Sequence, residues 1–293
     1  MSENVIEIHD LSRRFGRKTA LRNLSLDVAD GSVFGLVGEN GAGKTTVIKH
    51  VLGLFRPQQG SVSVFGLDPV QDPIGVLGRT GYLSEDRDMP PWMRVEELMR
   101  YSRSFYPNWD EPFAVQLREM FELPKSQKIK TLSRGQRARM GLLIAVAHRP
   151  RLLLLDEPSS GLDPSVRRDI LTAIIRTVAD EGRTVVFSSH LLDEVERVAD
   201  SVALLHEGRV IMHGAMDDVL ASHTVIVLRF EQPQAEHPNL NGGISWRGED
   251  REWTCLCNGK SDELKKAAAA AGATIVEERS PSLEEVFLAR TGN

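Results

Sequence analysis

Nine consecutive residues near the N-terminus have the types and spacing of a phosphate-binding turn, matching the pattern GxxxxGK[ST]. They are Gly38, Glu39, Asn40, Gly41, Ala42, Gly43, Lys44, Thr45 and Thr46. Glycines let backbone N–H groups turn inward toward an anion, Lys44 can reach the β- and γ-phosphates, and the Thr45 hydroxyl can bind Mg²⁺. An apolar run at residues 32–37 precedes the turn, and apolar residues at helical spacing follow it. This context favours a phosphate cradle, residues 38–46, over the alternative of a glycine turn without a ligand.

Two adjacent carboxylates follow a second apolar run, Leu152 to Leu155. An unbroken run of this kind is typical of a central parallel strand, so Asp156 and Glu157 are expected at its C-terminal end, where α/β folds bind ligands. Two acids held there fit a bound cation or an attacking water. His190 follows another expected strand, residues 184–187. A single histidine is more often structural, so both readings of His190 stay open on the residue alone.

A second helix N-terminus is expected at residues 132–136, Leu-Ser-Arg-Gly-Gln. Apolar residues follow it at helical spacing, and Ser133 stands where an N-cap belongs. Phe15 is the one aromatic residue in a basic, polar turn. Its ring could lie flat on a purine or pack against its neighbours, and the residue alone does not decide between the two.

The remaining pattern predicts an α/β fold. Helical periodicity from Val95 to Phe121 separates the cradle from the carboxylate strand, and a domain boundary is expected near residue 220. Beyond it, residues 221–293 alternate strand and helix patterns and predict a small C-terminal α/β domain. Further strands are expected at residues 5–8, 24–28, 60–66, 202–205 and 209–212.

Composition limits the class of protein. With 293 residues, 41% of them hydrophobic and 26% charged, the chain has the makeup of a globular protein of one large or two smaller domains. The net charge of −5 gives no electrostatic footprint for non-specific binding to nucleic acid, and no nucleic-acid partner is expected. Cys255 and Cys257 are too few for a zinc site and too close for a disulfide framework, which fits a reducing cytosol. Neither a signal peptide nor a membrane span is expected, so a role at a membrane would need a partner.

Taken in order, the cradle, the Leu132 to Gln136 segment, the carboxylate strand, Ser160 to Asp163 and His190 resemble the ATP-binding subunit of an ABC (ATP-binding cassette) transporter. The resemblance covers about residues 4–220. It implies a P-loop NTPase core of the ABC ATPase type, residues 1–220, with an antiparallel β subdomain and a helical insert at about residues 86–150. It also implies ATP and Mg²⁺ as ligands.

The resemblance implies a role for each motif residue. Asp156 holds Mg²⁺ through water, Glu157 is the general base for the attacking water, His190 senses the γ-phosphate, and Phe15 stacks on adenine. Lys44 belongs to the catalytic set because phosphoryl transfer depends mainly on positioning and charge neutralisation. The residues implied to contact ATP in the cradle of a second subunit are Ser133, Gly135 and Gln136.

Two positions depart from the family pattern. Glu85 stands where a glutamine is usual, and we predict it as a third metal-site residue beside Thr45 and Asp156. Arg134 replaces a glycine in the second-subunit segment, and we hypothesise that it pairs with Glu39 of the opposite subunit.

Function is therefore expected to be that of an ATPase motor subunit, as a homodimer or with a paralogous ATPase subunit, driving an integral membrane permease. The C-terminal segment 282–288 is similar to the tail of export-type subunits, which favours export. The alternative is a soluble ABC-type ATPase acting on DNA or ribosomes, but the chain has neither the long coiled-coil insert nor the second cassette common there. The expected location is the cytoplasmic face of the cell membrane, with attachment through the permease.

Overall fold

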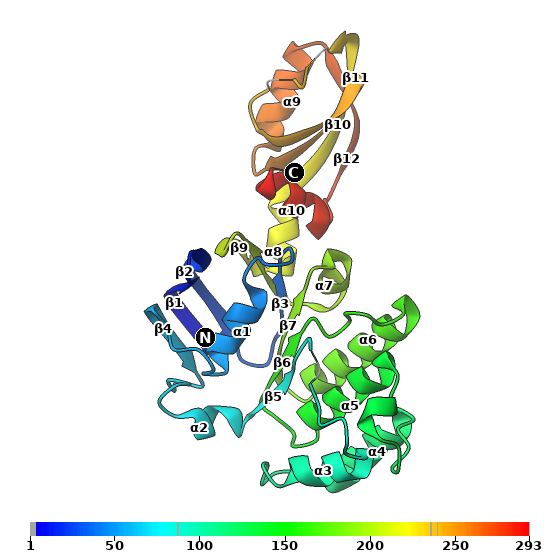
Figure 1. Ribbon diagram of the computed structural model, residues 1–293. Helices are drawn as coiled ribbons and strands as arrows, with labels where there is room; N and C mark the ends of the chain where they lie inside the picture. The colour runs from blue at the N-terminus through cyan, green and yellow to red at the C-terminus, as the bar shows by residue number, and fades with distance from the viewer. Residues whose placement is uncertain (1–3, 87, 235, 239, 293) are drawn as a thin grey trace.

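A six-stranded sheet of mostly parallel strands lies at the centre of the first 220 residues (Figure 1). The computed structural model describes residues 4–86, 88–234, 236–238 and 240–292. Every residue of β3, β6 and β7 is buried, because helices or a second sheet cover both faces. Within this six-stranded sheet, β8 and β9 pair antiparallel and the other neighbouring strands pair parallel. In sheet order the strands are β5 (Thr80–Leu83), β6 (Leu152–Asp156), β7 (Thr184–Ser189), β3 (Val33–Val37), β8 (Ser201–His206) and β9 (Arg209–Ala215).

A three-stranded antiparallel sheet covers one side of this core, and α1 (Lys44–Val51) lies between the two sheets. Its order is β2 (Lys18–Ala29), β1 (Asn4–Phe15) and β4 (Gln59–Val64), so the strand predicted at residues 60–66 is β4, at the edge of this sheet. The predicted strands 5–8 and 24–28 were too short, since both continue to the end of a hairpin where Phe15 pairs with Lys18. The short α2 (Pro73–Leu77) then leads to β5.

Helices cover the other face of the central sheet. Their apolar sides form one core with the sheet, as helical periodicity predicts. No helix within the described ranges is both long and apolar enough to cross a membrane. The helices are α3 (Val95–Arg103), α4 (Glu111–Met120), the 3₁₀ turn η1 (Ile129–Thr131), α5 (Arg134–Val146), α6 (Pro164–Asp180) and α7 (Leu192–Val198).

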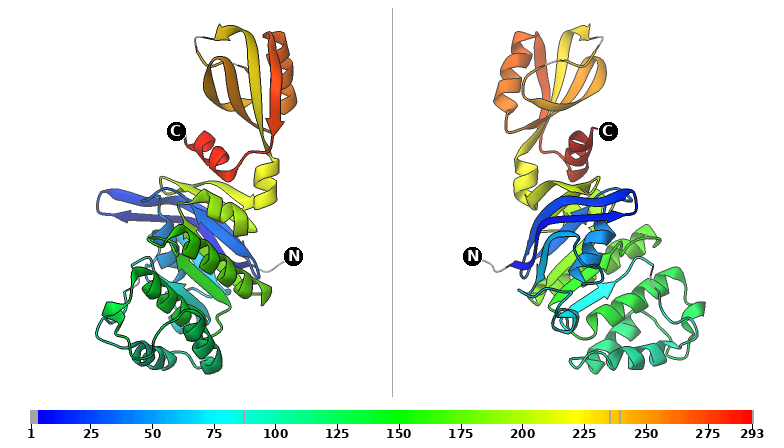
Figure 2. Two further views of the ribbon diagram at one scale, coloured as in Figure 1. Left: turned by 90° about the vertical axis from the view of Figure 1, so that its right-hand side faces the viewer. Right: turned by 60° about the vertical axis from the view of Figure 1, so that its left-hand side comes forward.

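The C-terminal part has a core of its own, built from a three-stranded sheet and α9 (Ser261–Ala270) (Figure 2). The predicted boundary near residue 220 falls within α8 (Met216–Ala221), and the first strand of the sheet starts at His223. Cys255 and Cys257 are buried together in this core, as alternation along one strand predicts. The sheet order is β11 (Gly243–Asn258), β10 (His223–Gln234) and β12 (Ala273–Arg279).

The last helix, α10 (Leu283–Thr291), returns to the first part of the chain and packs against α7. Leu283, Val286 and Phe287 belong to the same apolar core as the helices on the central sheet. The Leu283 N–H donates to Glu196 Oε2 at 2.8 Å, so an α7 carboxylate caps the start of α10. Helix α7 therefore touches both the central sheet and the C-terminal helix (Figure 1).

The start of α10 is also fixed from its own side. Glu285 accepts two hydrogen bonds from Arg279, at 2.6 and 2.8 Å, and one from the Ser282 N–H at 2.9 Å. The Arg279 hydrogen bonds lower the pKa of Glu285 from 4.5 to about 2. Because its pKa is lowered on folding, the charged carboxylate stabilises the fold above about pH 4.5, and this stability is lost as the pH falls toward 2.

We expect Glu285→Gln to lower the melting temperature most at about pH 7, with a difference from wild type that shrinks toward about pH 3. Thermal unfolding followed by circular dichroism at several pH values measures this difference. The control is Glu284→Gln, because Glu284 is exposed on the same helical turn. Equal, pH-independent shifts in the two variants would contradict a charge effect at Glu285.

Candidate functional site

The phosphate cradle is a loop whose backbone only glycine can follow. Gly41 and Gly43 have φ angles of +85° and +116°, a region that residues with a Cβ avoid. A Cβ on Gly38 would lie 2.4 Å from the Leu205 carbonyl oxygen, and one on Gly43 would lie 2.8 Å from the Leu21 side chain. Gly43 is the N-cap of α1 and offers no side-chain cap, so the first N–H groups of the helix are available to an anion.

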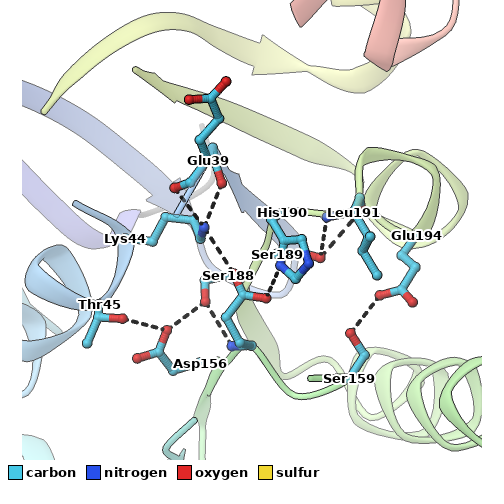
Figure 3. Close-up of polar contacts among 12 residues, drawn as sticks. Glu39, Lys44, Thr45, Asp156, Ser159, Ser188, Ser189, His190, Leu191 and Glu194 are labelled. Carbon is cyan, nitrogen blue, oxygen red and sulfur yellow. Dashed lines mark hydrogen bonds and ion pairs between the residues drawn. The ribbon is translucent and has the colours of Figure 1, made fainter. Parts of the chain in front are cut away.

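Lys44 is buried at the start of α1, with 5% of its surface exposed. Its ammonium donates to the carbonyl oxygen of Glu39 at 3.3 Å (Figure 3) and to that of Gly38 at 2.6 Å. It also lies 2.9 Å from Glu157 Oε1. The structure thus brings the cradle lysine and the predicted base into one ion pair, although they are 113 residues apart in the sequence.

Asp156 lies at the end of β6 and is 1% exposed. Its Oδ1 accepts hydrogen bonds from Thr45 Oγ1 at 3.2 Å and from Ser188 Oγ at 2.7 Å. Burial raises the pKa of Asp156, and these two hydrogen bonds act in the opposite direction. A hydroxyl beside a buried carboxylate is the oxygen-only donor set that Mg²⁺ prefers, so Thr45 and Asp156 fit this ion.

Glu157 has a left-handed backbone, with φ of 46°, and is 4% exposed. This conformation is unusual for a residue with a side chain, and such strain concentrates at functional sites. Its Oε2 accepts from His190 Nδ1 at 2.8 Å. Its Oε1 accepts no hydrogen bond from the described residues, although the Lys44 ammonium is close. A buried carboxylate oxygen without a hydrogen bond is suited to receive one from a water.

Ser188 is a site residue that the sequence analysis missed. Its hydroxyl donates to Asp156 and accepts from the Glu157 N–H at 2.9 Å. The only available signal was its place at the end of an apolar run, because its contact depends on the register that pairs Asp156 with Ser188.

Glu85 follows β5, the strand that pairs with the carboxylate strand β6. Its side chain is exposed, and no hydrogen bond within the described ranges joins it to Thr45 or Asp156. Glu85 and Asp156 are nevertheless both close to Tyr82, because the charges of both act on its hydroxyl. Burial and then the charges of Asp156, Asp86 and Glu85 raise the pKa of Tyr82 to about 12. No three histidine, cysteine or acidic residues among those described are grouped to hold a metal by themselves. The metal role of Glu85 stays a prediction.

Phe15 was expected in a turn, but it is the last residue of β1. Its ring is 5.5 Å from the Phe55 ring, edge to face, and the Arg13 guanidinium lies 4.7 Å from its centroid. Its hairpin partner Lys18 places its ammonium near Gly41 of the cradle, so this hairpin end lies beside the phosphate turn. Phe15 is still 42% exposed, and stacking on adenine stays a prediction.

The second predicted helix N-terminus is formed, but away from the cradle of the same chain. Ser133 is the N-cap of α5 and exchanges hydrogen bonds with Gln136 at 3.0 and 3.1 Å. Helix α5 packs against β5, α3 and α4, whereas α1 packs against β2, β4 and β6. The exposed Arg134 lies against Gly161 of its own chain, and its pairing with Glu39 of another subunit stays a hypothesis. Gly135 follows in the first turn of α5.

The fold and the cradle define a P-loop ATPase with an added antiparallel sheet and a helical lobe. A solved structure described as the ATP-binding subunit of an ABC transporter aligns with a TM-score of 0.69 and 29% identity, over 74% of this chain and 92% of that one. Residues 21–160 match the sequence pattern of the ABC transporter family.

Curated relatives extend the match to nearly the whole chain. The Nod factor export ATP-binding protein I of Rhizobium etli is 31% identical over 305 residues, covering 100% of this chain and 95% of its own length. The daunorubicin/doxorubicin resistance ATP-binding protein DrrA of Streptomyces peucetius is 34% identical over 310 residues, covering 98% and 92%. The chain belongs to the ATP-binding subunits of ABC transporters. The predicted family, fold class and ATPase function are confirmed.

Gly43→Ala tests the cradle directly. We expect ATP affinity to fall by at least about tenfold, equivalent to about 1.4 kcal/mol, because the new methyl group would press on Leu21 and displace the loop. Titration with a fluorescent ATP analogue measures this affinity. The control is Gly182→Ala, where φ is +71° but no atom lies within 4 Å of the added carbon. Equal ATP affinities in the two variants would contradict this prediction, because they would show that a Cβ at Gly43 disturbs ATP binding no more than one at Gly182 does.

Proposed function

We propose that this ABC ATPase hydrolyses ATP with Glu157 as the general base, and the observation that carries this is the bonding of its carboxylate. One oxygen is fixed by His190 at 2.8 Å, and the other, which accepts no hydrogen bond from the described residues, is held only by the ion pair with Lys44 at 2.9 Å. When a phosphate draws Lys44 away, this second oxygen is left for the attacking water, while His190 still holds the first. The proton of the water passes to Glu157 as the water oxygen attacks the γ-phosphorus, and the bond from the γ-phosphorus to the bridging oxygen breaks, so that ADP leaves with that oxygen.

The other charged groups bind and orient the phosphates. Lys44 and the first N–H groups of α1 neutralise the β- and γ-phosphate oxygens, while Thr45 and Asp156 would hold Mg²⁺. When bound, this ion neutralises the charge on the phosphate oxygens. Lys44 now contacts Glu157, so a phosphate that attracts its ammonium would loosen this ion pair and leave the base to the water. His190, next to the base, would respond to the γ-phosphate.

The working unit is a dimer, of two copies of this chain or of this chain and a paralogous ATPase subunit. Ser133, Gly135 and Gln136 lie at a helix start that does not face the cradle of their own chain. A second subunit can present the same residues to that cradle, so that two ATP molecules are enclosed between the subunits.

The dimer drives an integral membrane permease from the cytoplasmic face of the membrane, and the transport direction is export. Two relatives that match almost the full length carry names of a Nod factor export protein and a drug resistance protein. The permease meets the segment from Glu85 to Arg103. Large apolar side chains are exposed there, with Trp92 at 70% and Tyr101 at 50%.

Glu157→Gln tests the base. We expect nucleotide binding to be kept and steady-state turnover to fall by about 10²–10⁴-fold, the usual effect of losing a positioned general base. A phosphate-release assay and a nucleotide titration give the two quantities. The control is Glu122→Gln, at an exposed residue that also has a positive φ, of 54°. Turnover near that of wild type in Glu157→Gln would assign the base to another residue.

Trp92→Ser tests the permease contact. We expect a tagged variant to recover less of any membrane protein with several hydrophobic spans from detergent-solubilised membranes, while its ATPase activity in the absence of membranes is kept. Ile275→Ser is the control, because Ile275 is an exposed apolar residue of the C-terminal sheet, at 44%. Unchanged recovery with Trp92→Ser, and with charge reversal at Asp86 and Asp88, would place the contact elsewhere.

A further inference from the structure

Helix α7 and the residues before it hold the loop that follows β6 at two points. His190 bonds to Glu157 at 2.8 Å, and two residues further along that loop the Ser159 hydroxyl donates to Glu194 Oε2 at 2.9 Å (Figure 3). Ser159 is 3% exposed, and the Glu194 side chain is 15% exposed. Nothing in the proposed chemistry uses Glu194, although it is only four residues from His190 in the sequence.

The second oxygen of Glu194 faces Arg167 of α6. Arg167 Nη1 lies 3.7 Å from Glu194 Oε1, and Arg167 Nη2 donates to the Leu162 carbonyl oxygen at 3.0 Å. The loop is thus held at its start through Glu157, in its middle through Ser159, and at its end through Leu162. Burial raises the pKa of Glu194, and the hydrogen bond from Ser159 and then the charge of Arg167 lower it.

Helix α7, from which Glu194 makes these contacts, packs on the central sheet. Val195, next to Glu194, packs so closely on β3 that a Cβ on Gly35 would lie 2.2 Å from its side chain. Strand β3 leads directly into the cradle. Glu194 therefore fixes the loop carrying the base relative to an element that is itself fixed relative to the phosphates.

We propose that Glu194 is a positioning residue for Glu157. Its hydrogen bond with Ser159 holds the loop in the turn that gives Glu157 its left-handed backbone, and so places the Glu157 carboxylate against His190 and Lys44. Among the described residues no hydrogen bond or ion pair joins Glu194 to these groups, and only its charge interacts with that of His190, so its direct contact is with the loop. The proposal rests on the role of Glu157 as the base, and it predicts changes in turnover rather than in ATP binding.

Glu194→Ala and Ser159→Ala remove the two partners of this hydrogen bond. We expect each to lower kcat by about 10–100-fold, the effect of displacing a catalytic group by about 1 Å, with ATP affinity within about twofold of wild type. The double variant should be no slower than the slower single variant, because both remove the same contact. Glu194→Gln keeps an oxygen that accepts from Ser159, so it should restore most of the lost rate. Asp193→Asn, at the exposed neighbouring residue, is the control on the same helix.

The same changes are then made in the Glu157→Gln background, where the residual rate no longer depends on the base. Glu194→Ala should have no further effect there, and an additional loss of similar size would overturn the proposal by showing that Glu194 acts elsewhere. Wild-type kcat in folded Ser159→Ala would also overturn it. Because Ser159→Ala removes only one hydroxyl, it provides the test even if Glu194→Ala fails to fold. Failure of the base assignment is seen separately, as normal turnover in Glu157→Gln alone.

Discussion

The burial of two adjacent carboxylates at the end of one strand is the constraint on which the rest of the site depends. A buried charge is unfavourable unless other groups compensate it with charge or hydrogen bonds. For Asp156 and Glu157 these groups come from three places in the chain: Lys44 and Thr45 at the start of α1, Ser188 at the end of β7, and His190 just beyond. Parallel strands in the order β6, β7, β3 bring all three to one edge of the sheet.

This constraint also explains why α7 has contacts on several sides. The helix must keep His190 at Glu157, and it does so by close packing on Gly35 and by the contact of Glu194 with Ser159. Its remaining side carries Glu196, which caps α10. The element that supports the catalytic loop is therefore the element on which the C-terminal helix rests, so the two parts of the chain share one core at this point.

The sequence predicts those parts of the site that depend on neighbouring residues. The cradle follows from glycine spacing, and the placement of Asp156 and Glu157 follows from an uninterrupted apolar run. Ser188 and the pair of Ser159 and Glu194 could not be predicted, because each contact joins residues more than 30 positions apart through strand register or helix packing. The length of β1 and β2 was missed for a similar reason. Their polar ends are ordered by pairing across the hairpin, a tertiary effect that overrides local preference.

The capping of α5 explains how an exposed helix start can stay ready for a ligand. Ser133 and Gln136 satisfy each other's backbone N–H groups, so the end of the helix is stable without a partner. The Ser133 hydroxyl acts there as an acceptor, which leaves its proton free to be donated to an incoming oxygen. At the cradle the opposite solution is used, since Gly43 caps α1 without a side chain and leaves the first N–H groups to the phosphates. One helix start is thus complete in itself and the other is completed by its substrate. This difference is what a site closed between two subunits requires, because the half that arrives must be folded before it meets the nucleotide.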